Sequence, residues 1–212
     1  TLSKAEVQLL EKLNFGRTKT DMKIVTILGS PRKRGNTATV LRAFEALAAP
    51  QHEIDRINIT DYHVAGCLGC DHCFSNLTEP GCAQRDDAVR LLARILAADL
   101  VVYASPVYCW AFPAQLKALL DRHYCLVKWR DGEVAAALMT GKRAALLVTC
   151  GGDAEANADL IQAMFDREIA YLRGVVAGKY VVANCSTPAE LGERAAALGQ
   201  QMARELTGPR DS

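Results

Sequence analysis

Short apolar runs alternate along the chain with longer segments in which apolar residues recur every three or four positions. The short runs predict β-strands, and the longer segments predict amphipathic helices. The expected strands span residues 23–29, 52–59, 99–105, 143–150 and 174–185. The expected helices span residues 37–47, 86–98, 113–127, 154–173 and 188–206. Because most of the strands are apolar along their whole length, the alternation predicts a parallel sheet covered by helices on both faces.

The first 21 residues lie outside this alternation. Ser3 and Glu6 form a capping-box pattern, and apolar residues follow at helical spacing. We therefore expect residues 1–21 to form a helical extension and residues 22–212 to form one domain.

Composition and charge narrow the class of protein. Half of the 212 residues are apolar and 23% are charged, which suits a folded domain better than a disordered chain. The formal net charge of +1 argues against nucleic acid or anionic membranes as the main partners. No apolar run reaches the roughly 18 residues that span a bilayer, and the N-terminal sequence does not resemble a signal peptide. We therefore expect a cytoplasmic protein whose cysteines stay reduced.

A glycine-containing loop follows the first expected strand. In "GSPRKRGNTATV", residues 29–40, two glycines permit tight turns and a helix begins near Asn36. The free N–H groups at the start of that helix suit a phosphate, and Ser30 and Thr37 add short polar side chains. The loop lacks both the Walker A and the G-x-G-x-x-G patterns, so a terminal phosphate monoester fits best. The alternative is an ordinary strand-to-helix turn with a polar cap.

Aromatic residues gather after the third expected strand. The segment "SPVYCWAF", residues 105–112, holds three aromatic residues, although only 6% of the chain is aromatic. Such a loop can stack on a flat ring. Gly151 and Gly152, after the fourth strand, allow a ligand edge to approach the backbone closely. The alternative for Trp110 and Phe112 is packing in the core or at a subunit interface.

Half of the eight cysteines fall in the loop of residues 66–83. Cys67, Cys70 and Cys73 have C-x2-C-x2-C spacing, and Cys82 follows after eight more residues. The same initial spacing with one more distant cysteine occurs in ferredoxin-type [4Fe–4S] sites, so these four cysteines are candidate cluster ligands. A loop without metal, a zinc site and a disulfide are the alternatives.

These motifs occur in an order that resembles a known family. "GSPRKRGNT", then the spaced cysteines followed by "DD", then "ADLVVYASPVYCWAFPAQLKALLDR" is similar to the NAD(P)H-dependent FMN reductase superfamily, most closely its iron–sulfur flavoprotein branch. The resemblance covers most of residues 22–152 and implies a flavodoxin-like three-layer α/β sandwich with a five-stranded parallel sheet of order 2-1-3-4-5. The gap between Cys73 and Cys82 is longer than the family usually has.

The resemblance also implies which residues bind FMN. The phosphate end would be held by Ser30, Arg32, Asn36 and Thr37. The flavin would be lined by Pro106, Val107, Tyr108 and Trp110, and its ring would be bordered by Cys150, Gly151 and Gly152. Because the flavin itself performs the hydride or electron chemistry in this family, no catalytic side chain is expected.

Together the features predict an FMN-dependent NAD(P)H oxidoreductase that reduces quinones, flavins or similar acceptors, with a [4Fe–4S] cluster as a candidate second centre. The alternative is an iron–sulfur flavoprotein electron carrier that receives electrons from a protein partner rather than from NAD(P)H. A zinc-stabilised binding module would leave the phosphate and aromatic loops unexplained. The expected partners are a small-molecule acceptor or a redox protein. The apolar surface of the aromatic loop and the following helix predicts a homodimer or homotetramer.

Overall fold

The central sheet has the predicted strand order. The computed structural model describes residues 22–208, so the extension expected at residues 1–21 lies outside the described residues. The parallel strands are β1 (Lys23–Leu28), β2 (Glu53–Asn58), β3 (Leu100–Pro106), β6 (Arg143–Thr149) and β7 (Val175–Val182). They pair in the order β2-β1-β3-β6-β7, which is 2-1-3-4-5 when only these five strands are numbered.

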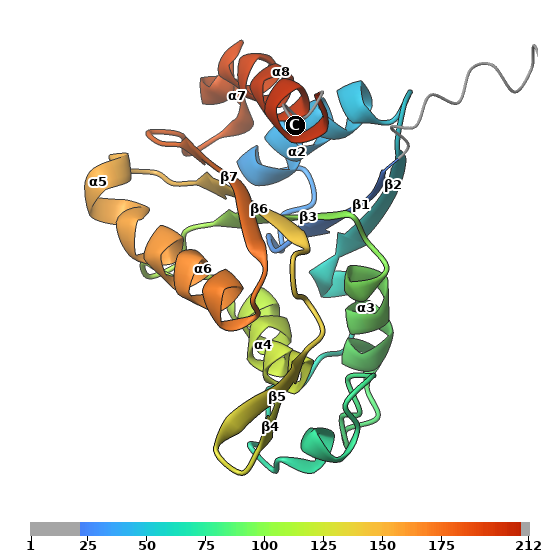
Figure 1. Cartoon of the computed structure of the whole chain (residues 1–212). Helices are drawn as coiled ribbons and strands as arrows, with labels where there is room; N and C mark the ends of the chain where they lie inside the picture. The colour runs from blue at the N-terminus through green and yellow to red at the C-terminus, as the bar shows by residue number, and fades with distance from the viewer. Residues whose placement is uncertain (1–21, 209–212) are drawn as a thin grey trace, which may run out of the picture.

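Helices cover both faces of this sheet and complete a three-layer sandwich (Figure 1). One face carries α2 (Asn36–Ala48), α7 (Pro188–Leu191) and α8 (Arg194–Thr207). The other face carries α3 (Asp87–Leu96), α4 (Ala114–Arg122) and α6 (Asp159–Tyr171), with the short α5 (Ala154–Asn157) before α6. Side chains alternate between the two faces along each strand. Val25 therefore packs on the face covered by α3, and Ile24 packs on the face covered by α2.

An antiparallel hairpin follows α4, where the sequence pattern predicted helix as far as residue 127. The 3-10 turn η3 (His123–Leu126) leads into β4 (Val127–Arg130), which pairs with β5 (Glu133–Ala137). Asp131 and Gly132 form the turn, with φ angles of 52° and 81°. Asp-Gly is a strong signal for a two-residue hairpin turn, so these strands had a recognisable sequence marker.

Two of the predicted long helices are interrupted. The helix expected over residues 154–173 is divided at Ala158 into α5 and α6. The helix expected over residues 188–206 is divided near Gly192, whose left-handed φ of 49° ends α7. Two further 3-10 turns, η1 (Ile59–Asp61) and η2 (His72–Ser75), lie before and within the cysteine loop.

The chain leaves neighbouring strands toward opposite faces of the sheet. The connection after β1 leads to α2, whereas the connection after β3 leads to α4 on the other face. Diverging connections leave a crevice at the carboxyl ends of the strands, where such sheets bind ligands. The backbone N–H of Gly29 donates to the carbonyl of Ala104 here, and a Cβ on Gly29 would lie 2.5 Å from Leu116 Cδ2. Glycine therefore lets the loop after β1 pass close to α4.

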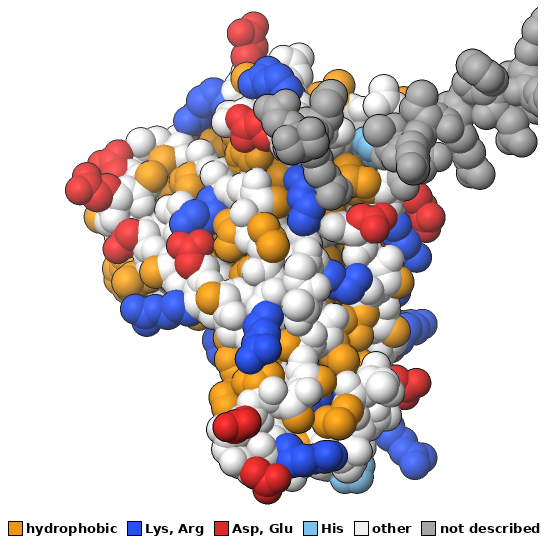
Figure 2. Space-filling model, in the orientation of Figure 1, with side chains coloured by type: hydrophobic (Ala, Val, Ile, Leu, Met, Phe, Trp, Pro, Cys, Tyr) orange, Lys and Arg blue, Asp and Glu red, His pale blue; other side chains and the backbone are white. Residues whose placement is uncertain are grey.

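The surface mixes charges of both signs. Figure 2 shows basic and acidic side chains interspersed over the face that it presents. Across residues 22–208, no helix combines the length and apolar character that crossing a membrane requires.

Candidate functional site

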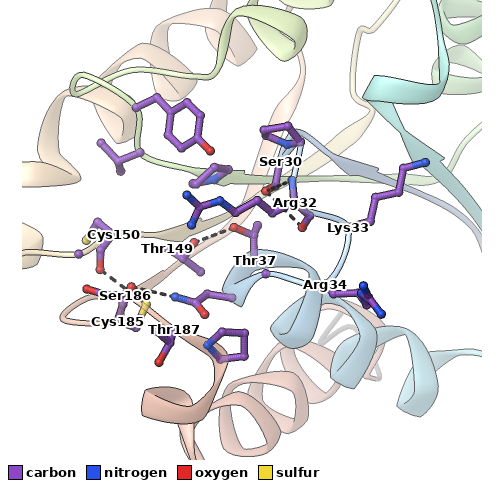
Figure 3. A pocket seen from close by; sticks show the side chains of 18 residues that line it. Ser30, Arg32, Lys33, Arg34, Thr37, Thr149, Cys150, Cys185, Ser186 and Thr187 are labelled. Atoms are coloured by element: carbon purple, nitrogen blue, oxygen red, sulfur yellow. Dashed lines mark hydrogen bonds between the residues drawn. The ribbon is translucent and has the colours of Figure 1, made fainter.

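A cavity of about 920 Å³ opens at the carboxyl ends of four parallel strands (Figure 3). Its lining comes from the segments that follow β1, β3, β6 and β7, namely residues 30–37, 106–108, 149–151 and 185–188. A cavity of this size can enclose a nucleotide-sized cofactor. It therefore coincides with the crevice that the sheet topology creates.

The start of α2 forms one end of the cavity. Gly35 precedes the helix and no side chain caps it, so the first N–H groups of α2 remain available to an anion. The hydroxyl of Thr37 lies 2.7 Å from that of Thr149, and the amide nitrogen of Asn36 donates to the carbonyl of Cys185 at 2.8 Å. The other amide atom of Asn36, Oδ1, is buried without a partner among the described residues. A ligand hydroxyl at this place would satisfy that oxygen.

Positive charge lies beside the same helix start. Arg32, Lys33 and Arg34 all contribute to the cavity lining, and Lys33 is paired with Asp61. In Figure 3 the side chain of Arg32 extends toward β3 and β6, whereas Lys33 and Arg34 lie on the other side of the loop. The hydroxyl of Ser30 accepts a hydrogen bond from the Arg32 N–H at 3.1 Å and shapes this turn. Guanidinium groups beside an uncapped helix start suit a phosphate ester.

The segment after β3 supplies an apolar wall. Pro106, Val107 and Tyr108 line the cavity, and Tyr108 is 40% exposed. Cys109 and Trp110 follow with left-handed φ angles of 47° and 61°, a conformation that costs free energy for residues other than glycine. Such backbone strain is often found at ligand-binding loops.

Trp110 and Gly152 are not among the residues that line the cavity, although they were predicted to contact the flavin. The indole N–H of Trp110 donates to the carbonyl of Ala156 at 3.1 Å, which directs the ring toward α5. The α-carbon of Gly152 packs against Asn157, because a Cβ there would lie 2.5 Å from Asn157 Nδ2. Phe112 is buried in the hydrophobic core, which agrees with the alternative that assigned it to packing rather than to the flavin site. The other predicted flavin-site residues, Ser30, Arg32, Asn36, Thr37, Pro106, Val107, Tyr108, Cys150 and Gly151, surround the cavity.

The sequence analysis missed the contribution of the last strand. Cys185, Ser186, Thr187 and Pro188 follow β7 and close the cavity opposite the start of α2. Burial raises the pKa of the Cys185 thiol and also that of Cys150. Both thiols are therefore neutral near pH 7 and leave the positive charge of the loop after β1 uncancelled. The rule that ligands bind at strand ends applies to β7 as well and would have identified this segment.

The cysteine loop forms a separate, smaller pocket. It is lined by Cys67, Cys70, Cys73 and Cys82, together with Cys125 and neighbouring residues of the loop and of the segment after α4. Its volume is about 10 Å³, near the smallest that admits one water molecule. All eight cysteines carry free thiols, so the disulfide alternative is not realised here.

The thiols in this pocket are not arranged around one point. Within residues 22–208, no three His, Cys, Asp or Glu side chains come close enough together to hold a metal ion. Cys67 and Cys70 are exposed, whereas Cys73 is buried. The donor set fits a thiolate-bound centre, but Cys67 and Cys70 must turn inward and the pocket must widen to bind one. Nothing lies within 4 Å of a Cβ built on Gly66 or Gly69, which leaves the backbone room for this change.

Comparisons with known proteins agree with this geometry. The family model described as NADPH-dependent FMN reductase matches residues 22–187. An iron-sulfur flavoprotein of Archaeoglobus fulgidus is 39% identical over 102 residues, which are 48% of this chain and 45% of that protein. An FMN-dependent NADH:quinone oxidoreductase of Thiobacillus denitrificans is 38% identical over 88 residues, 37% of this chain and 42% of that protein.

Solved structures share the fold. An NAD(P)H:quinone oxidoreductase from Methanothermobacter marburgensis superposes with a TM-score of 0.66 at 18% identity, over 91% of this chain and 99% of that one. At this identity the similarity concerns the fold alone. The chain spans about half the length of the curated iron-sulfur flavoproteins that it matches first.

Proposed function

Because the chain belongs to the NADPH-dependent FMN reductase family, we propose that its 920 Å³ cavity binds FMN. The uncapped start of α2, with Asn36 and Thr37, would receive the phosphate, and Arg32 would balance its charge. Pro106, Val107 and Tyr108 would pack against the flavin, and Cys150 and Gly151 would border its ring. Bound FMN would supply the hydride and electron chemistry. The observation that carries the proposal is the convergence of four strand ends on one cavity beside an uncapped helix start.

The phosphate contact is tested by removing its side chains. Asn36→Ala together with Thr37→Ala should weaken FMN binding, because it removes the Thr37 hydroxyl and the second amide hydrogen of Asn36 as donors to the phosphate. Each such hydrogen bond to a charged group contributes about 1–3 kcal/mol. Flavin fluorescence titration measures the loss, and Thr140→Ala, an exposed threonine outside the cavity lining, is the control. Unchanged affinity of the double variant would place the phosphate elsewhere.

The proposed reaction transfers reducing equivalents from NAD(P)H to a quinone, a flavin or a similar acceptor. It is supported by the family and by the name of the quinone oxidoreductase relative. The chain's own residues would orient the flavin and leave one side of it open to both substrates. Stopped-flow mixing of the flavin-loaded protein with NADPH and with NADH tests the proposal through rapid loss of flavin absorbance.

A second candidate is an iron–sulfur flavoprotein electron carrier that takes electrons from a protein partner. The observation that favours it is the pocket shared by Cys67, Cys70, Cys73 and Cys82, the predicted ligands of a [4Fe–4S] cluster. If neither nicotinamide nucleotide reduces the bound flavin while a reduced redox protein does, the carrier is favoured over the NAD(P)H oxidoreductase.

The cluster itself is tested by metal analysis. Anaerobically purified protein should contain about four irons per chain. Cys70→Ser should remove the iron and leave FMN bound, because the two pockets share no lining residue. Cys109→Ser, an exposed cysteine outside the cysteine pocket, should keep both. Full flavin without iron in the unaltered protein would leave an FMN reductase with one centre.

We also propose a homodimer or homotetramer in the cytoplasm. Tyr108, Trp110 and Leu160 expose 40%, 55% and 54% of their surface. Tyr108 lines the flavin cavity and Trp110 contacts α5, so a second subunit seated here would close the cavity from outside. Light scattering at micromolar concentration should show an oligomer, and a catalytically active 23.0 kDa monomer would contradict it.

A further inference from the structure

Two buried cations flank the cysteine loop, and no role in the FMN site accounts for them. The first is Arg122, at the end of α4, whose side chain has no exposed surface. Its Nη1 donates to the carbonyl of Ala65 at 3.1 Å and to Asp86 Oδ2 at 2.7 Å, and its Nη2 donates to Cys82 Sγ at 3.1 Å. Arg122 therefore joins the two ends of the loop and also presents a charged N–H donor to a predicted ligand sulfur.

The second cation is Lys128 on β4, which is fully buried. Its Nζ lies 2.9 Å from the carbonyl oxygen of Cys73 and 2.9 Å from that of Pro80. These two carbonyls stand near the two ends of the eight-residue segment between Cys73 and Cys82. The hairpin that carries Lys128 lies beside the cysteine loop in Figure 1. Lys128 therefore holds together the part of the loop that is longer than the family pattern.

Of the two buried cations, only Arg122 is paired with a carboxylate in the described part of the chain. Asp86 pairs with Arg122, but Lys128 bonds two neutral carbonyls and forms no ion pair within residues 22–208. Burial of an unpaired ammonium group costs several kcal/mol. The hydrogen bond to the carbonyl of Cys73 places the ammonium group of Lys128 beside the pocket that Cys73 and Cys82 line. The arrangement suits a negative charge at the thiols.

We propose that Lys128 and Arg122 supply the counter-charge for an anionic iron–sulfur centre bound by Cys67, Cys70, Cys73 and Cys82, and raise its reduction potential. The inference rests on the cluster assigned to this loop under the proposed function. Reduction adds one electron and makes the four-thiolate centre one charge more negative. Nearby buried cations and N–H···S hydrogen bonds stabilise that reduced state. In this role both are positioning residues that act on the centre through the ligand loop.

The experiment measures the midpoint potential of the centre in anaerobically purified holoprotein, by redox titration followed by electron paramagnetic resonance. Lys128→Met keeps the length of the side chain and removes the charge. It should shift the reduction equilibrium at least tenfold toward the oxidised form, which is a fall of about 59 mV for a one-electron couple. Lys128→Arg should restore most of the potential because it restores the charge.

Lys142→Met is the matched control. Lys142 is a half-buried lysine whose Nζ also donates to a backbone carbonyl, that of Ala98, but it lies outside the cysteine pocket. Arg122→Lys keeps a positive charge but loses the forked donor, so it should lower the potential less than Lys128→Met does.

The outcomes separate this inference from the cluster itself. An unchanged potential in Lys128→Met, with full iron content, would overturn the counter-charge role while the cluster remained. Iron lost in Lys128→Met but retained in Lys128→Arg would support the counter-charge role, because Arg keeps the positive charge and Met does not. Iron lost in both variants would assign Lys128 to loop folding alone and overturn the inference. An unaltered protein that holds no iron would overturn the cluster and the inference together.

Discussion

At the scale of single residues, a partly buried ion pair holds β2 in place at the start of the connection to the cysteine loop. Arg94 on α3 donates to Asp55 on β2, with its Nε 2.9 Å from Asp55 Oδ2, and also to the hydroxyl of Tyr62. The hydrogen bond from Arg94 lowers the pKa of Asp55 below its ordinary value. This pair fixes α3 to the edge strand that leads into the cysteine loop.

The first prediction concerns this carboxylate. A group with a lowered pKa in the folded state stabilises the fold fully above its ordinary pKa of 3.8, and the stabilisation is lost as pH falls through the folded-state pKa. Asp55→Asn should therefore lower the free energy of unfolding at pH 7. The loss should be only about 1 kcal/mol because the pair is partly solvated. In strong acid, where Asp55 is protonated, the substitution should leave the free energy of unfolding unchanged. Urea unfolding at several pH values measures this. Asp166→Asn, in the more exposed pair with Lys179, should change stability by less than about 0.5 kcal/mol. An equal cost of Asp55→Asn at every pH would contradict the electrostatic cause.

At the scale of elements, close helix packing depends on one glycine. Gly199 in α8 faces α2, where a Cβ would lie 2.7 Å from Ala43 Cβ and 2.9 Å from the backbone nitrogen of Phe44. The backbone of α2 cannot yield as a flexible side chain can. The two helices therefore approach each other through this position.

The second prediction tests that contact. Gly199→Ala should lower the free energy of unfolding by about 1–3 kcal/mol, because forced separation of the helices outweighs the helix propensity that alanine adds. Gln200→Ala, an exposed neighbour on the same helix, should have little effect. Thermal or urea denaturation measures both, and a stabilised Gly199→Ala variant would show that α2 and α8 are not tightly packed.

The buried parallel strands could be predicted from the sequence, whereas the β4–β5 hairpin was missed. Apolar runs such as Leu100–Pro106 mark buried parallel strands directly, because a strand covered on both faces excludes polar side chains. The β4–β5 hairpin was missed because Val127 and Leu126 continue the apolar spacing of α4, although the Asp131–Gly132 turn signals a hairpin. Continued periodicity does not by itself show that a helix continues.

At the scale of the whole molecule, the site brings together segments from four distant parts of the chain. The phosphate loop was predictable because its glycines and helix start are adjacent in sequence. The places of Arg122 and Lys128 were not, since their contacts with the cysteine loop join residues that are 36 to 57 positions apart. Only the folded chain brings these groups together.

The third prediction concerns the stability of the assembled cavity. FMN should raise the melting temperature, because a ligand at 100 times its Kd adds about 2.7 kcal/mol to the free energy of unfolding. Riboflavin lacks the phosphate and should raise it less at the same concentration. The Asn36→Ala, Thr37→Ala double variant should reduce this difference between the two ligands. Equal shifts with FMN and riboflavin in the unaltered protein would exclude a phosphate site at α2.

The chain contains only two tryptophans, and they lie in different parts of the fold. Trp110 follows Tyr108 at the flavin cavity, whereas Trp129 follows Lys128 on β4, with its indole 3.3 Å from the hydroxyl of Tyr171. A bound flavin absorbs where tryptophan emits and quenches the nearer indole. Replacing Trp129 with Phe leaves Trp110, beside α5, as the only emitting indole, and replacing Trp110 with Phe leaves Trp129, beside α6. The difference in quenching between the two single-tryptophan variants therefore reports FMN binding in real time, from the protein's own emission.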